Sequence, residues 1–106
     1  MKLIPLIAAC FLLPTTLSGQ NLEVWFVDVG QGDCTLLRSP TGETFLFDGG
    51  DTGEGAATVV PLLQSLGISH LDWVSASHYH ADHIGGLDEV WNYGIRATTC
   101  LDRGDD

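Results

Sequence analysis

The stretch Ser77-His78-Tyr79-His80-Ala81-Asp82-His83-Ile84-Gly85-Gly86 decides how this chain is interpreted. It places three histidines and one aspartate, which are side chains that bind divalent metal ions, within six residues. The chain has four histidines, and the remaining one, His70, is expected to be a solvent-exposed loop residue. Such clustering predicts a metal site rather than a set of ordinary loop histidines.

The spacing of these ligands predicts two neighbouring metal positions. A chain that leaves a strand is extended, so His78 and His80 point to the same side and share the first metal. The chain must then turn, with help from Gly85-Gly86, and Asp82 and His83 face a second point. Imidazoles combined with a carboxylate suit zinc first, then iron or manganese. We therefore expect two divalent ions, zinc above others, with Asp82 as the catalytic group that orients and activates a water molecule.

Length and charge limit the class of protein. The chain has 106 residues, which is enough for one small domain. Its formal net charge of −10 makes it a poor general binder of nucleic acid, because phosphate backbones are repelled at long range. Bound cations would reverse that sign locally, so a small-molecule or phosphodiester substrate is expected and nucleic acid stays a possible partner.

Residues 1–19 have the pattern of a secretory signal peptide. Lys2 gives a positive start, Leu3–Leu13 is almost wholly apolar, and Thr16-Leu17-Ser18 suits cleavage after residue 18 or 19. The apolar run is too short for an ordinary membrane span, so none is expected after its removal. A buried N-terminal strand or helix and a lipoprotein cleavage site ending at Cys10 are the alternatives. The pattern predicts a secreted or periplasmic protein.

The remaining residues, 22–106, are expected to form one α/β domain. Residues 22–29, 34–39 and 44–47 predict an antiparallel meander of three strands. Apolar residues at 59, 62, 63 and 66 predict a helix that ends at Gly67 and either starts near Pro61 or kinks there. A helix followed by a strand at 71–77 suggests a crossover back into the same sheet.

The second part of this domain is expected to contain a loop, a short helix and a last strand. The loop is residues 78–83, the helix carries Leu87, Val90 and Trp91 on one face, and the strand is residues 95–101. The three tryptophans are expected to fill the core, and they are Trp25, Trp73 and Trp91.

The cysteines do not indicate a metal site. Cys34 is expected to be a small buried residue of a strand, and pairing between Cys34 and Cys100 is left open. Neither lies in a pair of the CxxC type, so we do not expect a cysteine-based zinc site.

Three motifs together resemble those of a known family. The histidine-rich stretch is similar to the HxHxDH signature of the metallo-β-lactamase superfamily. Asp28-Val29-Gly30-Gln31-Gly32-Asp33 and Asp48-Gly49-Gly50 resemble motifs of its ComEC-like subgroup, the hydrolase domain of competence proteins. The resemblance runs from about residue 22 to residue 91 and implies an αββα sandwich, of which this chain covers roughly the first half.

The resemblance also implies roles for three further aspartates. Asp48 would lie beneath the metals and hold a ligand histidine. Asp28 and Asp33 would flank the strand ends near the site, although a role as turn-forming acids is equally expected. The family needs a further histidine, a metal-bridging aspartate and a final histidine downstream, and no histidine follows His83 here. The domain is therefore expected to be truncated.

These observations favour a secreted metal-dependent hydrolase. The resemblance to competence proteins favours phosphodiester or related bonds as the substrate, since two metals can bind both the attacking and the leaving oxygen of a phosphate ester. Amide or lactam hydrolysis is one alternative. A non-catalytic or inactive fragment of such a domain is the other.

Overall fold

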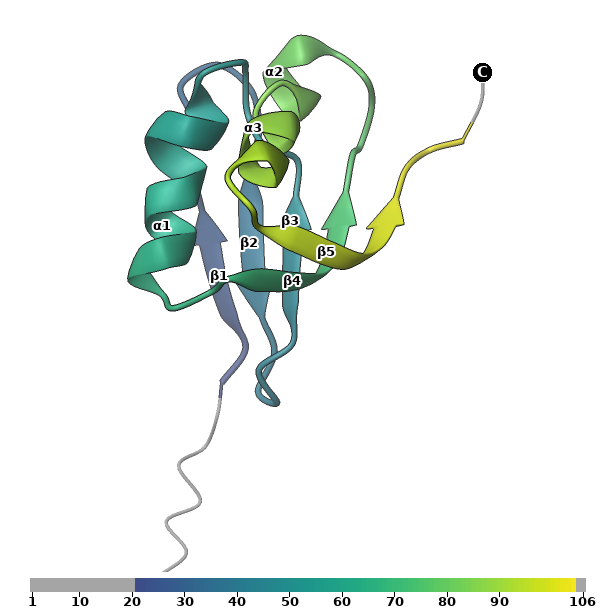
Figure 1. Cartoon of the computed structure of the whole chain (residues 1–106). Coiled ribbons are helices and arrows are strands. Elements are labelled where there is room, and N and C mark those ends of the chain that lie inside the picture. Colours follow the sequence, from purple (N-terminus) through teal and green to yellow (C-terminus); the bar gives the residue numbers. More distant parts are fainter. Residues whose placement is uncertain (1–20, 105–106) are drawn as a thin grey trace, which may run out of the picture.

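The computed structural model describes residues 21–104, which form one five-stranded sheet with its helices on one face (Figure 1). The predicted signal peptide, residues 1–19, lies outside the described residues. The strands are β1 (Glu23–Phe26), β2 (Thr35–Arg38), β3 (Thr44–Phe47), β4 (His70–Ser75) and β5 (Arg96–Leu101). The helices are the π-helical turn η1 (Gly55–Val59), α1 (Val60–Ser65), α2 (Ala81–Ile84) and α3 (Leu87–Asn92).

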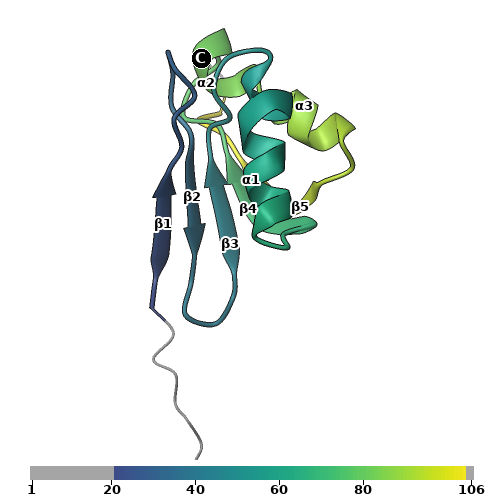
Figure 2. The same cartoon turned by 90° about the vertical axis from the view of Figure 1, so that its left-hand side faces the viewer.

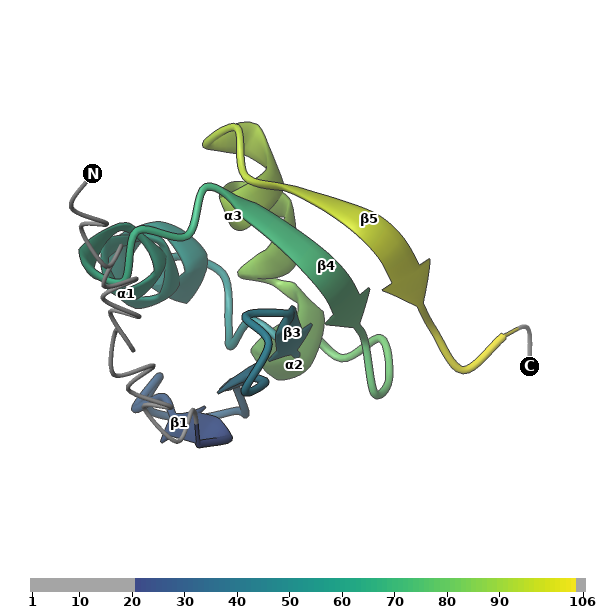
Figure 3. The same ribbon diagram turned by 90° about the horizontal axis from the view of Figure 1, so that it is seen from below.

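The strands lie in the sheet in chain order, β1-β2-β3-β4-β5. The first three form the predicted antiparallel meander, with Leu36 opposite Leu46 in the register of β2 and β3. β3 and β4 are parallel, as are β4 and β5, and Figure 3 shows the last two side by side. Parallel neighbours need a crossover, which η1 and α1 supply for β4, and α2 and α3 supply for β5. The predicted crossover is confirmed, and it brings the carboxyl ends of β3 and β4 to one edge of the sheet.

The α-helix starts near Pro61, which is one of the two predicted alternatives. Pro61 lies in the first turn of α1, where its missing N–H group is not needed. The preceding residues are wound as a π-helical turn that runs directly into α1. The helix ends as predicted at Gly67, whose φ of 71° lies in the left-handed region.

The core lies between the sheet and the helices. Leu36 and Leu46 of the central strands are fully buried against Leu63 of α1. Figure 2 shows α1 and α3 on the same side of the sheet. Other buried residues of this core are Val29, Cys34, Val59, Val60, Ile68, Leu71, Val90 and Ile95. The predicted burial of Cys34 is confirmed, whereas Cys100 is exposed and the two thiols are free.

The opposite face of the sheet is apolar and uncovered in the part of the chain that the structure describes. Leu37, Phe45 and Trp73 are cross-strand neighbours, and they alternate with the buried row that contains Leu36 and Leu46. Trp73 is 41% exposed for this reason, so its predicted place in the core is wrong.

The other two tryptophans differ from each other. Trp25 packs against the core as predicted. Trp91 is 44% exposed on α3, where the guanidinium of Arg96 lies 4.4 Å from its ring centroid, so its predicted core position is wrong. Among residues 21–104, no helix has both the length and the apolar character needed to cross a membrane.

Truncation of a large side chain should lower the free energy of unfolding much more on the covered face of the sheet than on the uncovered face. Leu36→Ala, on the covered face, should lower the free energy of unfolding by about 2–5 kcal/mol, because it leaves a cavity in the core. Phe26→Ala should change it by only about 0.5 kcal/mol, because that side chain is 85% exposed. Urea denaturation followed by circular dichroism measures both values. Equal losses for the two variants would contradict the described core.

Candidate metal centre

The candidate site lies where the carboxyl ends of β3 and β4 meet. Asp48 follows β3 directly, and its backbone N–H donates to the carbonyl of Ser75 at 2.9 Å, which continues the pairing with β4. The histidine-rich stretch begins two residues after β4, at Ser77-His78. Residues far apart in the sequence therefore meet at one edge of the sheet because the two strands are parallel.

The predicted loop at 78–83 is only partly a loop. His80 is extended, with φ of −70° and ψ of 144°, and the next four residues form the single helical turn α2. The amide of Ile84 donates to the carbonyl of His80 at 3.1 Å, and that of Gly85 to the carbonyl of Ala81 at 2.8 Å. The expected turn is thus a helical one, closed by hydrogen bonds between residues four apart.

This turn brings three of the four predicted ligands together. His78, Asp82 and His83 each offer a ligand atom, and these atoms all lie within 4.8 Å of one another. The rings of His78 and His83 have centroids 3.8 Å apart, and His83 Nε2 lies 3.7 Å from Asp82 Oδ1. All three residues are half-buried. The arrangement offers two nitrogens and one carboxylate oxygen around one point.

His80 lies next to this group but outside it. Its ring meets the His78 ring edge-on, with centroids 4.9 Å apart, and its side chain is exposed. The role of His80 as a ligand, and the division of the four ligands into two pairs, stay predictions.

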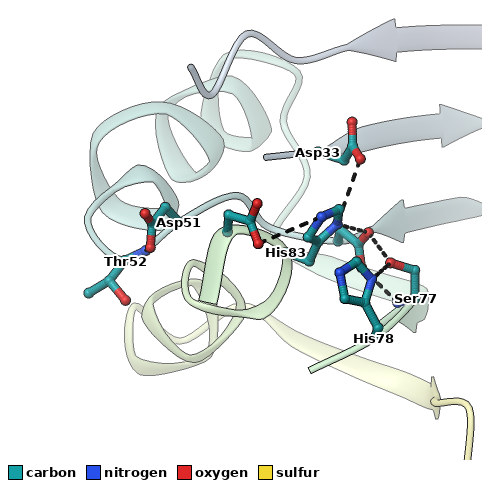
Figure 4. A network of polar contacts seen from close by, with 8 residues as sticks. Asp33, Asp51, Thr52, Ser77, His78 and His83 are labelled. Carbon is teal, nitrogen blue, oxygen red and sulfur yellow. Dashed lines mark hydrogen bonds and ion pairs between the residues drawn. The ribbon is translucent and has the colours of Figure 1, made fainter. Parts of the chain in front are cut away.

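Asp48 is the buried centre of the hydrogen-bond network. The residue is 2% exposed, and its φ of 60° is the only left-handed one among the described residues other than glycine. Asp48 Oδ1 accepts from the amide of Ser77 at 2.7 Å, and Oδ2 pairs with His83 Nδ1 at 2.9 Å. Figure 4 shows Ser77, His78 and His83 gathered in this network. The carboxylate therefore contacts a histidine of the cluster, and its role of holding a metal ligand, which the family resemblance implies, stays a prediction.

The carboxylates around His83 raise the pKa of its imidazole. Its hydrogen bond with Asp48 raises the pKa of the His83 imidazole above the usual value, and burial opposes this effect. The negative charges of Asp48, Asp82 and Asp33 raise it further. The site is thus a place of negative potential, which also attracts metal cations.

The remaining two predicted aspartates differ in what they contact. Asp33 Oδ2 lies 3.7 Å from His83 Nδ1, so Asp33 does flank the cluster (Figure 4). The exposed carboxylate of Asp28 accepts from the amide of Gly30 at 3.1 Å, which is the contact of a turn-forming aspartate.

The three glycine-containing motifs are interlocked through their backbones. The amide of Asp33 donates to the carbonyl of Asp82, and the amide of Gly49 donates to that of His83. A Cβ atom added at Gly32 would lie 1.9 Å from the carbonyl oxygen of Asp82, and one at Gly86 would lie 1.9 Å from that of Gly49. Glycine is needed at both positions because no side chain fits between segments this close.

Cys34 is not equipped to act as a ligand or nucleophile. Burial, together with the negative charge of Asp48, raises the pKa of its thiol to about 12. A thiolate is the form that binds metal or attacks substrates, so this cysteine is inert near neutral pH.

Comparison with known proteins identifies the family. The family model described as "Metallo-beta-lactamase superfamily" matches residues 27–95, so the chain belongs to the metallo-β-lactamase superfamily. Members are generally hydrolytic and typically bind divalent metals. The chain is 37% identical over 69 residues to "Competence protein ComA" of Neisseria gonorrhoeae, a match that covers 65% of this chain and 10% of that protein. It thus spans about a tenth of the length of the curated relative it matches, and no solved structure matches it.

The sequence reasoning missed Ser77 as part of the site. It was taken only as the end of a strand, yet both its amide and its hydroxyl donate to Asp48. No local pattern could have identified it, because its partner Asp48 lies 29 residues away in the sequence.

The backbone interlock predicts a large difference between two glycines of the same loop. Gly30 and Gly32 both have positive φ, at 67° and 111°, but an added Cβ at Gly30 meets nothing within 4 Å. Gly30→Ala should cost only the left-handed strain of about 1–2 kcal/mol. Gly32→Ala should cost more than about 4 kcal/mol or prevent folding, because it forces the backbone away from Asp82. Thermal and urea unfolding measure both, and similar losses for the two variants would argue against the interlock.

Proposed function

We propose that this chain carries part of a secreted or periplasmic metal-dependent hydrolase that acts on phosphodiester or related bonds. The observation that carries the proposal is the convergence of His78, Asp82 and His83 at the end of two parallel strands. The buried carboxylate of Asp48 beside His83 supports it, because ligand histidines are commonly oriented by such a partner.

The side chains present fit a divalent cation. Two imidazoles and a carboxylate suit zinc in particular, and His78, Asp82 and His83 would hold it. When bound, such an ion lowers the pKa of water and stabilises negative charge that develops on the substrate. A second ion, with His80 among its ligands, is part of the proposal.

The protein's own residues would orient the reaction. Asp48 accepts a hydrogen bond at His83 Nδ1, which leaves Nε2 of that ring, the nitrogen nearer Asp82, free to face a cation. Asp82 would act as the catalytic carboxylate, because its Oδ1 lies at the same point and can accept a proton from an attacking water molecule. Asp33 adds negative charge from the other side of His83.

Two observations favour phosphodiesters over lactams. The relative named above is a competence protein, and the two glycine-rich motifs resemble that subgroup. A net charge of −10 means that a phosphate group would approach only where bound cations reverse the local potential, which is the site itself. Nucleic acid is proposed as a possible partner because of the competence-protein relative and the resemblance of the motifs, and not because of the charge. The signal-like residues 1–19 support export.

Metal uptake is the most direct test of the site. The protein should bind zinc, and His83→Ala should reduce the affinity at least about 100-fold, because it removes a ligand that Asp48 already orients. The matched control is His70→Ala, which removes an exposed histidine that contacts Thr98 on the neighbouring strand. Isothermal titration with zinc and metal analysis after dialysis give affinity and stoichiometry. Two tightly held ions per chain indicate a complete site, one indicates a partial site, and no uptake would rule out the proposed function.

Hydrolysis distinguishes the proposed substrate class from its alternatives. The zinc-loaded protein should cleave bis(p-nitrophenyl) phosphate. Asp82→Asn should lower kcat/KM by about 100-fold or more, within the range for loss of general-base catalysis. His80→Ala should lower it by about the same factor, because a proposed ligand of the second ion is lost. Release of p-nitrophenolate measures the rate. Equal turnover by wild type and variants would remove the assignment, and turnover of a chromogenic β-lactam alone would favour the lactam alternative. Metal uptake with neither activity would identify a non-catalytic metal-binding domain.

A further inference from the structure

The hydroxyl of Ser77 lies between the buried carboxylate and a second histidine of the cluster. Ser77 Oγ donates to Asp48 Oδ2 at 2.6 Å and lies 3.0 Å from His78 Nδ1. Its amide donates to Asp48 Oδ1 at 2.7 Å, so the serine is held to both oxygens of one carboxylate (Figure 4). Asp48 thus touches His83 directly and reaches His78 only through Ser77.

Counting hydrogens decides the direction of these bonds. A serine hydroxyl has one hydrogen, and a carboxylate can only accept. The hydrogen of Ser77 is therefore committed to Asp48, and the oxygen of Ser77 can only accept from His78. It follows that Nδ1 of His78 carries the hydrogen, because two acceptors facing each other at 3.0 Å would repel.

The position of Ser77 is set by the sheet. Ser77 follows β4, and Asp48 follows the parallel neighbour β3, whose pairing continues through the amide of Asp48 and the carbonyl of Ser75. Asp48 is also 2% exposed, so the carboxylate has little freedom to move. The serine is therefore placed by backbone structure, which is more rigid than a loop side chain.

We propose that Ser77 is a positioning residue that extends the hold of Asp48 to His78, so that one buried carboxylate sets the tautomer of two imidazoles. Both rings then carry hydrogen at Nδ1 and leave Nε2 free as the metal ligand. The significance for metal binding rests on the proposed function, whereas the tautomer is a property of the metal-free chain.

The test compares variants that remove or keep the hydroxyl. Long-range ¹H–¹⁵N correlation spectra of the metal-free protein report which ring nitrogen carries hydrogen, at a pH well above the usual histidine value of about 6.5. In the wild type, His78 and His83 should both have hydrogen at Nδ1. In Ser77→Ala, His78 should lose this tautomer while His83 keeps it, and Ser77→Thr should restore it. Ser69→Ala, at an exposed position just before β4, is the matched control and should change neither ring.

Zinc affinity gives a second measurement. Ser77→Ala should weaken zinc binding about 10- to 100-fold, the range for loss of a group that orients a ligand, and Ser77→Thr should recover most of it. Unchanged His83 signals show that the Ala variant is folded. Hydrogen at Nε2 of His78 in the wild type, or an unchanged His78 tautomer in Ser77→Ala, would overturn the proposal. The expected tautomers without any zinc uptake would support the role of Ser77 and refute the proposed metal site.

Discussion

The buried carboxylate of Asp48 is the constraint on which the rest of the site depends. Burying a charged group to 2% exposure is costly unless it is hydrogen-bonded, and Ser77 and His83 supply three hydrogen bonds to this carboxylate. Ser77 follows β4 and His83 lies on α2, so the hydrogen bonds of one carboxylate fix the end of a strand and a short helix together. The left-handed backbone of Asp48 aims the side chain at this point and is a local strain that the surrounding hydrogen bonds offset.

The parallel pairing of β3 and β4 explains how this constraint arises from the sequence. Strand patterns and turn residues predicted the meander, the crossover and the cap at Gly67, because each is a local signal with a clear physical cause. The exposure of Trp73 could not be predicted in this way. A tryptophan in a strand reports only that the strand is apolar, whereas its face follows from the register with Phe45.

In the site, too, features that depend on neighbouring residues could be predicted from the sequence, and features that depend on distant residues could not. The spacing predicted a metal-binding cluster in this short stretch, because a bend after a strand brings such side chains together. It paired His78 with His80, whereas the structure gathers the ligand atoms of His78, Asp82 and His83. The role of Asp48 was inferred only from the family resemblance, and the structure shows its hydrogen bond with His83. Ser77 was missed because its partner is 29 residues away, and a hydrogen bond over that separation leaves no periodic pattern in the sequence.

The contacts at Gly32 and Gly86 have a consequence for how such a site can change. Here backbone touches backbone, so the two loops are fixed by atoms that every amino acid shares. Side chains that point outward from the same loops, such as those of Gln31 and Tyr79, are exposed and take no part in that contact. Substitutions at these outward positions alter the rim of the cluster and leave its ligands where they are. In these loops the backbone atoms hold the ligands in place, and the exposed side chains are left to determine what the rim of the cluster contacts.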